Sequence, residues 1–262
     1  MSSINRPAGH SCETCPAHNV SNLIKLGINM DDWDYVVALA GNPNTGKTTL
    51  FNCIAGKHPV TSGKIVFDGE DITALKAHEV ARRGLARTFQ VYAAAGDLTV
   101  RENVMVGCFM RTASRRQARE RADAILEDLN LTATAADYVS ELPVAAQKQV
   151  TMATALGSRP KLLLLDEVAA GLNPGEIEEI IASIRHIHHQ LGLTVNLIEH
   201  VMELVMRTSD RLIVLDYGRK IAEGSPDHLK ADARTPTHPD PTLEDAFIAL
   251  IEQSEDREAV PT

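Results

Sequence analysis

The sequence is poor in cysteine and contains no long apolar run. Its four cysteines, Cys12, Cys15, Cys53 and Cys108, are too few and too unevenly spaced for a disulfide framework in a chain of 262 residues. No apolar stretch approaches the roughly 18 residues that a membrane span needs, and residues 1–30 contain no apolar signal core. These absences argue against a disulfide-stabilised secreted domain and an integral membrane protein, and we expect a soluble protein of the cytoplasm.

Basic residues are in the minority, since 26 lysines and arginines stand against 35 aspartates and glutamates. The resulting net charge of −9 argues against binding to nucleic acid. Hydrophobic residues form 44% of the chain and charged residues 23%, as in ordinary globular proteins. The length therefore fits one large domain, or a core domain with a helical insert.

Short aliphatic runs, separated by helical patterns, predict buried strands. The first is the run VVALA, which follows Tyr35 and ends at Gly41. Three similar runs cover residues 162–166, 194–198 and 211–215. Because strands and helices alternate along the chain, we predict an α/β fold with a mostly parallel sheet that is covered on both faces.

Apolar residues spaced three or four positions apart predict surface helices that pack on this sheet. Residues 64–73 alternate polar and apolar side chains around an Asp-Gly pair, which predicts an antiparallel hairpin. Thr242 is the predicted N-cap of a further helix. The two longest apolar faces consist of Ala118, Ala122, Ile125, Leu126 and Leu129, and of Ile177, Ile180, Ile181, Ile184 and Leu191.

Composition divides the chain into four segments. Residues 1–33 are polar, carry two of the cysteines, and are expected to be weakly ordered. Residues 34–230 form the main domain. Residues 231–241 contain three prolines and are a predicted linker, and residues 242–262 hold an amphipathic helix and a tail.

The segment GNPNTGKT, residues 41–48, matches the phosphate-loop pattern G-x-x-x-x-G-K-S/T. It lies between a predicted buried strand and a predicted helix, which is the context that the motif requires. Backbone N–H groups of such a loop bind phosphate oxygens, while Lys47 would neutralise the β- and γ-phosphates and Thr48 would bind Mg²⁺. The residues that we expect to bind the nucleotide are Gly41, Asn42, Pro43, Asn44, Thr45, Gly46, Lys47, Thr48 and Thr49.

A site of this kind also needs a carboxylate at the end of a neighbouring strand. The segment KLLLLDE places Asp166 at the end of an aliphatic strand, followed directly by Glu167. Asp166 would lie on the Mg²⁺ side of the nucleotide, and Glu167 would polarise a water molecule at the γ-phosphate. The alternative is a strand that merely ends in two solvated acids. The presence of a phosphate loop in the same chain favours the functional interpretation.

Six segments between about residues 51 and 223 resemble, in the same order, the ATPase subunits of ABC transporters, and among these the branched-chain amino acid importer group. The resemblance implies a P-loop NTPase of ABC ATPase type, with a helical insert at about residues 91–157 and a reduced antiparallel subdomain. It also implies that two copies bind Mg·ATP between them and drive a membrane permease from the inner face of the cell membrane. The six segments are SGKIVFDGEDIT, RRGLARTFQ, LTVRENVMVG, DEVAAGLNPGE, LIEHVMELV and SDRLIVLDYGRKIAEGSP.

The resemblance assigns roles to further residues. Gln90, which ends ARTFQ, would join Mg²⁺ and the attacking water to the helical insert, and residues 171–173 would lie at the dimer interface. His200 in LIEH would contact the γ-phosphate, although a lone histidine after a strand is more often structural. The predicted catalytic residues are thus Glu167, His200 and Gln90, and the predicted metal-site residues are Thr48, Gln90 and Asp166.

Two features depart from the ABC pattern. The segment LPVAAQKQ stands where the family has an LSGGQ-type signature, so that Val144 and Ala145 occupy the glycine positions. Because glycine lets a backbone approach phosphate closely, we predict a weaker clamp on the γ-phosphate and slower hydrolysis. The family's adenine-stacking aromatic is missing from its usual upstream position, the nearest being Trp33 and Tyr35. A fused or recombined nucleotide-binding protein with impaired hydrolysis is therefore an alternative.

Residues 10–55 resemble a second family, the ferrous-iron transport GTPases, in their Cys-bearing tail, first strand and phosphate loop. A GTPase would also need a DxxG switch and an NKxD guanine-binding motif, and neither occurs in a GTPase-like context. We keep this function as the less favoured alternative. A cluster in the tail has ligands suited to Zn²⁺ or iron, but its tight spacing favours a tail without metal. The cluster consists of His10, Cys12, Cys15 and His18.

Overall fold

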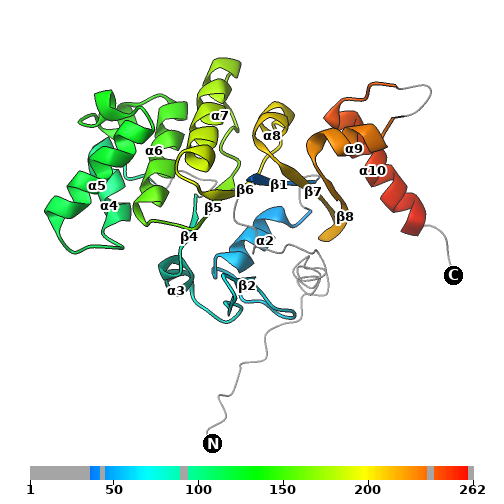
Figure 1. The fold of residues 1–262 in the computed structure, drawn as a ribbon, viewed down its shortest axis with the longest axis horizontal. Coiled ribbons are helices and arrows are strands. Elements are labelled where there is room, and N and C mark those ends of the chain that lie inside the picture. The colour runs from blue at the N-terminus through cyan, green and yellow to red at the C-terminus, as the bar shows by residue number, and fades with distance from the viewer. Residues whose placement is uncertain (1–35, 42–44, 89–93, 235–238, 259–262) are drawn as a thin grey trace, which may run out of the picture.

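The computed structural model describes residues 36–41, 45–88, 94–234 and 239–258, the last six of these by their backbone alone (Figure 1). The predicted tail at residues 1–33, with its His and Cys cluster, lies outside the described residues.

A six-stranded sheet, in the order β4-β5-β6-β1-β7-β8, forms the centre of the described structure. All neighbouring strands run parallel except β7 and β8, which are antiparallel. The four strands predicted from aliphatic runs are confirmed, and β7 continues one residue beyond the predicted end. The strands are β1 (Val36–Ala40), β4 (Leu85–Arg87), β5 (Leu162–Asp166), β6 (Thr194–Ile198), β7 (Arg211–Asp216) and β8 (Arg219–Gly224).

Alternate residues of the central strands face two separate hydrophobic clusters. In β5, Leu163 and Leu165 belong to the larger cluster, whereas Leu162 and Leu164 belong to the smaller one. This alternation follows from the two-residue period of a strand, and it explains why every position of β5 is apolar until Asp166. In Figure 1, α7 and α8 lie on one face of the sheet, and α2 and the hairpin strand β2 lie on the other. The prediction of a sheet covered on both faces is thus confirmed.

Helices account for most of the remaining described residues. Three of them, α4, α5 and α6, gather at one end of the sheet, within the segment predicted as a helical insert (Figure 1). At the opposite end α10 packs beside α9. The helices are α2 (Lys47–Ile54), α3 (Ala77–Arg82), α4 (Val100–Cys108), α5 (Arg115–Asp128), α6 (Val144–Gly157), α7 (Pro174–His189), α8 (Met202–Thr208), α9 (Pro226–Asp232) and α10 (Leu243–Glu258), with 3₁₀ turns η2 (Thr132–Thr134) and η3 (Val139–Glu141).

Helices α4 and α6 approach each other closely through two glycines. A Cβ atom on Gly107 of α4 would lie 1.9 Å from the carbonyl oxygen of Thr154, and one on Gly157 of α6 would lie 2.7 Å from the backbone nitrogen of Cys108. Any larger residue would force the two helices apart. The sequence therefore fixes the spacing of these helices at two positions that carry no side chain.

The predicted hairpin is confirmed as a small two-stranded sheet of β2 (Val66–Phe67) and β3 (Glu70–Asp71). Asp68 and Gly69 form its turn with φ angles of 52° and 74°, the left-handed values that a two-residue hairpin turn requires. The buried side chain of Phe67 joins the smaller core cluster with Phe51 of α2. This hairpin is the predicted reduced antiparallel unit, and it packs against the helix that follows the phosphate loop.

The predicted helices agree with the structure in their buried faces and differ from it at some of their ends. The predicted apolar faces are buried except for Leu191, which follows the end of α7 and is 39% exposed. Including Leu191 in that face was wrong, because the helix stops before the residue can complete another turn. Thr242 accepts a hydrogen bond from the Asp245 backbone nitrogen at 3.1 Å, so the predicted N-cap is confirmed. Helix α9 continues to Asp232, so the predicted linker starts later than residue 231.

Candidate functional site

The candidate site lies at the carboxyl edge of three neighbouring parallel strands. β1 ends before Gly41, β5 ends at Asp166, and β6 ends before Glu199 and His200. The strand register aligns Ile198 of β6 with both Leu39 of β1 and Asp166 of β5. Because all three strands point the same way, the phosphate loop, the acid pair and the histidine come together although they are far apart in sequence.

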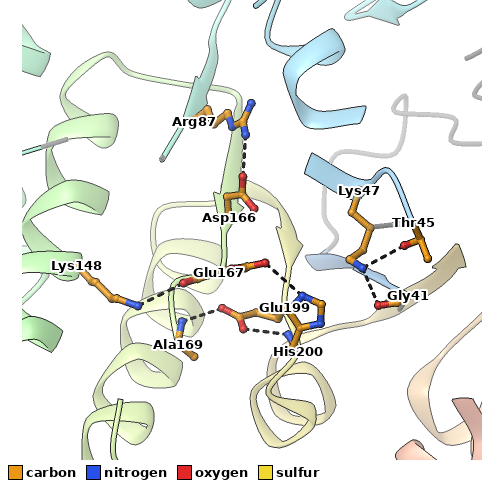
Figure 2. A network of polar contacts seen from close by, with 10 residues as sticks. All are labelled: Gly41, Thr45, Lys47, Arg87, Lys148, Asp166, Glu167, Ala169, Glu199 and His200. Carbon is orange, nitrogen blue, oxygen red and sulfur yellow. Dashed lines mark hydrogen bonds and ion pairs between the residues drawn. The ribbon is translucent and has the colours of Figure 1, made fainter. Parts of the chain in front are cut away.

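The described part of the phosphate loop surrounds the ammonium group of Lys47. The Nζ atom donates hydrogen bonds to the Gly41 carbonyl oxygen at 2.6 Å and to Thr45 Oγ1 at 3.2 Å (Figure 2). Burial lowers the pKa of Lys47 to about 8, although the nearby carboxylates of Glu167 and Asp166 oppose this shift. The loop thus holds a buried cation at the position where the predicted γ-phosphate would bind.

The loop backbone also has the features that phosphate binding needs. Gly46 is the N-cap of α2 with a φ of 88°, and no side chain of the described residues caps this helix end. A Cβ atom on Gly41 would lie 2.3 Å from the carbonyl oxygen of Leu215, so only glycine fits there. Thr48 and Thr49 follow in the first turn of α2 and are partly exposed, whereas Asn42, Pro43 and Asn44 lie outside the described residues. A helix end that no described side chain caps suits an anion, because its first backbone N–H groups lack partners within the helix.

Asp166 is buried at the end of β5 and is held by a cation from β4. Its Oδ2 atom accepts a hydrogen bond from Arg87 Nη2 at 2.7 Å (Figure 2). Arg87 Nη1 donates to Asn52 Oδ1 at 2.6 Å. Burial raises the pKa of Asp166, and the contact with Arg87 opposes this rise. The second oxygen, Oδ1, is buried and has no hydrogen-bond partner among the described residues. An unsatisfied buried carboxylate oxygen fits the water shell of a bound Mg²⁺.

Glu167 and His200 are in direct contact, with Glu167 Oε1 3.2 Å from His200 Nε2 (Figure 2). Glu167 has a positive φ of 51°, which is rare for a residue with a side chain. Its backbone nitrogen donates to the carbonyl oxygen of Ile198 at 2.9 Å, and this bond to β6 helps to hold the unusual conformation. Strained backbone of this kind is concentrated at functional sites. The structure therefore brings two of the three predicted catalytic residues together, while Gln90 lies outside the described residues.

Three polar residues of the site were not predicted as site residues. Arg87 pairs with Asp166, and Glu199 and Lys148 bond to the backbone of the loops around Glu167 and His200. Arg87 lies in the segment ARTFQ, three positions before Gln90, and Glu199 lies in LIEH, directly before His200, which is the signal that the sequence offered. Lys148 lies within the segment LPVAAQKQ, one helical turn after Val144. Apart from the bond between Glu199 and its neighbour His200, each of these contacts joins residues at least 19 positions apart, so that only the fold reveals it.

The altered signature adopts regular helical structure. Val144 and Ala145 form the first turn of α6, and neither has a positive φ. Ala145 is buried and Val144 is 47% exposed. Gln147 Nε2 donates to the Leu142 carbonyl oxygen at 2.5 Å and ties the helix start to the preceding segment. Residues larger than glycine are therefore accommodated in this helix start without backbone strain.

An apolar pocket of about 560 Å³ lies beside the Arg87–Asp166 pair. It is formed by the end of α2, by α3 and β4, and by α4 and α6 of the helical segment. Arg87 forms part of its lining, so the same side chain contacts both the pocket and Asp166. The lining also includes Ala55, Lys57, Ala81, Met110 and Ala155.

A phosphate loop, an acid pair and a histidine at one edge of a parallel sheet define a P-loop nucleotide-binding domain. The ABC transporter family model matches residues 29–170. The chain belongs to the ABC transporter family, as an ATP-binding subunit. Among the helices of the described residues, none combines the length and the apolar character that crossing a membrane requires.

Two curated relatives are ATP-binding proteins of branched-chain amino acid transport. The high-affinity branched-chain amino acid transport ATP-binding protein BraF of Pseudomonas aeruginosa is 37% identical over 220 residues, which cover 78% of this chain and 86% of the relative. The corresponding protein LivG of Escherichia coli K12 is 36% identical over 213 residues, covering 74% and 82%. The comparisons do not show the likeness to ferrous-iron transport GTPases.

Solved structures of ATP-binding cassettes share the fold. A nucleotide-free cassette from an ABC transporter matches with a TM-score of 0.69 and 28% identity, covering 78% of this chain and 86% of that chain. The ADP conformation of the cassette MJ1267 matches with a TM-score of 0.68 and 27% identity, covering 84% and 87%. The predicted fold class, an ABC-type P-loop fold with a mostly parallel sheet, is thus confirmed.

Proposed function

We propose that this chain hydrolyses Mg·ATP to drive an importer of branched-chain amino acids. The observation that carries the proposal is the contact between Glu167 and His200, beside the buried Lys47 and the unsatisfied oxygen of Asp166. Sequence identities of 37% and 36% to two branched-chain amino acid transport ATP-binding proteins support branched-chain amino acids as the solute class. GTP hydrolysis, which the N-terminal resemblance suggests, remains an alternative to be tested.

Each residue has a defined part in the proposed reaction. Glu167 accepts a hydrogen bond from the water that attacks the γ-phosphorus and so orients it in line with the leaving oxygen. Lys47 and His200 donate to the γ-phosphate oxygens, where negative charge develops. Thr48, Asp166 and Gln90 are the residues that would hold Mg²⁺ and its water shell. A metal ion held there would neutralise negative charge on the phosphate groups.

The proposed assembly is a head-to-tail pair of such subunits at the inner face of the cell membrane, docked on permease subunits. In this arrangement the signature segment of one copy faces the nucleotide of the other. The pocket beside Arg87 is the proposed seat of a permease segment, because it is apolar and is shared by the sheet domain and the helical segment. Solute binding to the permease would then affect the nucleotide site through Arg87, which lines the pocket and contacts Asp166.

The first test is phosphate release by the purified protein with Mg·ATP and with Mg·GTP, comparing wild type with Glu167→Gln. We expect turnover of ATP, and a loss of about 100-fold or more in the variant, because a positioned general base contributes that much. Nucleotide binding should persist in the variant. Glu178→Gln is the matched control, since Glu178 pairs with Arg207 on the surface of α7 and should not affect turnover. A preference for GTP would favour the GTPase, and binding without turnover in wild type would favour the impaired nucleotide-binding protein.

A further inference from the structure

Glu199 is a buried acid that the reaction outlined above does not use. Its carboxylate lies directly after β6 and the residue is only 1% exposed. Burial raises the pKa of Glu199, whereas hydrogen bonds from the backbone of Ala169, His200 and Val201 and the charge of Lys148 oppose this rise. Burying a carboxylate is costly unless its oxygens are satisfied, so this arrangement needs a reason beyond packing.

The two oxygens of Glu199 hold two different loops. Oε1 accepts a hydrogen bond from the Ala169 backbone nitrogen at 2.8 Å, in the loop that carries Glu167. Oε2 accepts one from the His200 backbone nitrogen at 3.2 Å (Figure 2). One carboxylate thereby fixes the separation of the two loops whose side chains meet at Glu167 Oε1 and His200 Nε2.

Lys148 connects the same loop to the helix that begins with the altered signature. Its Nζ atom donates to the Ala170 carbonyl oxygen at 2.6 Å and to the Glu167 carbonyl oxygen at 3.3 Å. Partial burial lowers the pKa of Lys148, and the charges of Glu199 and Glu167 oppose this shift. In Figure 2, Lys148 reaches from α6 to the loop after β5, on the side opposite His200.

These contacts form one chain from the signature helix to the catalytic pair. Lys148 lies one turn after Val144, the first residue of α6. A displacement of α6 away from this loop would separate the ammonium group of Lys148 from the two carbonyl oxygens and from the charge of Glu199. The loop then loses a charge-assisted contact on one side while Glu199 still holds it on the other.

We propose that Lys148 and Glu199 are positioning residues that transmit the position of the signature helix to Glu167 and His200. The inference rests on the proposed ATP hydrolysis and extends it, since it names the contacts by which a second subunit or a phosphate at the signature would alter the geometry of the water-activating pair. Neither residue touches the reacting atoms in this scheme. Both act through the backbone of the loops that carry the reacting side chains.

The test uses the full chain with Lys148→Met, Lys148→Arg and Glu199→Gln. Methionine keeps the length of the side chain but removes the charge, and glutamine leaves one acceptor oxygen for the backbone donors of both loops. We expect kcat for ATP to fall about tenfold in Lys148→Met and in Glu199→Gln, the size expected for losing hydrogen bonds to charged groups, with little change in the KM for ATP. Lys148→Arg should restore most of the loss, because arginine still donates to both carbonyl oxygens.

Lys161→Met is the matched control, because it also removes the charge of a lysine, and Lys161 forms an ion pair with Asp68 of the hairpin turn. A second readout does not depend on turnover. Amide hydrogen exchange in the nucleotide-free protein should accelerate at residues 167–171 and 199–201 in Lys148→Met and Glu199→Gln, and not in Lys161→Met.

Unchanged kcat together with unchanged exchange in Lys148→Met would overturn the proposal. A loss of ATP affinity equal to the loss of kcat would also overturn it, since that pattern indicates a general structural role. If the wild type shows no ATP turnover, the proposed function fails, while the exchange measurement still decides whether Lys148 and Glu199 hold the two loops.

Discussion

Arg87 and Asp166 form a buried ion pair, with Arg87 Nη2 2.7 Å from Asp166 Oδ2 and side chains that are 7% and 0% exposed. The pair joins two neighbouring strands, β4 and β5, at the edge where the phosphate loop lies. Arg87 also lines the apolar pocket and lies 5.7 Å from the centre of the Phe51 ring. One cation therefore links the pocket, the helix after the phosphate loop and the acid expected at the metal site.

Replacing Arg87 with methionine should destabilise the nucleotide-free protein by about 3 kcal/mol, because it leaves the buried carboxylate of Asp166 without its counter-charge. Mg·ATP should recover part of this loss, since the bound cation would offer Asp166 a new partner. Urea unfolding with and without Mg·ATP measures both effects.

The control for this prediction is Arg101→Met. Arg101 forms an ion pair with Asp123 at 2.6 Å, but both side chains are partly exposed. Exposed pairs contribute on the order of 0.5 kcal/mol, so this variant should unfold almost like wild type. Equal destabilisation by the two substitutions would contradict the prediction, because it would show that burial does not make the loss of Arg87 more costly than the loss of an exposed ion-pair partner.

The low pKa of Lys47 predicts proton uptake when ATP binds. In the nucleotide-free protein the pKa is about 8, so most of the Lys47 amines are neutral at pH 9. Phosphate oxygens favour the charged form and raise this pKa, so that binding at pH 9 should take up about one proton per ATP. Isothermal titration calorimetry at pH 9, in two buffers of different ionisation enthalpy, measures the uptake.

The same shift has a consequence for folding stability without nucleotide. Between pH 8 and 10.5 the unfolded chain carries a proton on Lys47 more often than the folded protein does. Stability contributed by this group therefore rises as the pH increases through that range.

The control for the proton-uptake prediction is a titration at pH 7. At this pH the Lys47 group is charged in both the free and the bound protein, and its contribution to proton uptake should be small. Identical uptake at pH 7 and pH 9 would contradict the assignment.

Substituting Gly107 should separate the helices α4 and α6. In Gly107→Ala the new Cβ would lie 1.9 Å from the carbonyl oxygen of Thr154, which belongs to a helix backbone that cannot yield locally. Overpacking of this kind costs about 1–3 kcal/mol, and thermal or urea unfolding measures it. Gly96→Ala is the control, because its Cβ would meet Ser140 Cβ at an ordinary 3.4 Å. Comparable unfolding of both variants would show that the helix contact is not tight.

The sequence predicted the site residues whose position depends only on their close neighbours along the chain. Asp166 and Glu167 follow an unbroken aliphatic strand, and Lys47 follows another strand at the spacing of the phosphate loop, so their placement at one sheet edge could be inferred. The partner of Asp166 could not, because Arg87 is 79 positions away and its contact depends on the register between β4 and β5. Likewise, the bond from Ala169 to Glu199 spans 30 positions and follows from the pairing of β5 with β6. Helix ends were the weakest part of the fold prediction, as the exposed Leu191 shows.

The altered signature gives a prediction in which stability and activity change in opposite directions. Ala145 is buried in the first turn of α6 and has an unstrained backbone. Ala145→Gly should therefore lower the free energy of unfolding slightly, by up to about 1 kcal/mol, because glycine is a poorer helix former than alanine. Turnover of ATP should nevertheless rise, because the missing Cβ would let the helix start approach the γ-phosphate of the opposing subunit more closely.

Ala153→Gly, in the buried middle of the same helix, is the control for a general loosening of α6. It should reduce stability at least as much without raising turnover. Steady-state phosphate release and urea unfolding of the two variants separate the effects. Turnover that stays at the wild-type level in Ala145→Gly would mean that alanine at this position does not limit hydrolysis, and the search for a weak step would then move to Val144 and to the contact of Lys148 with the catalytic loop.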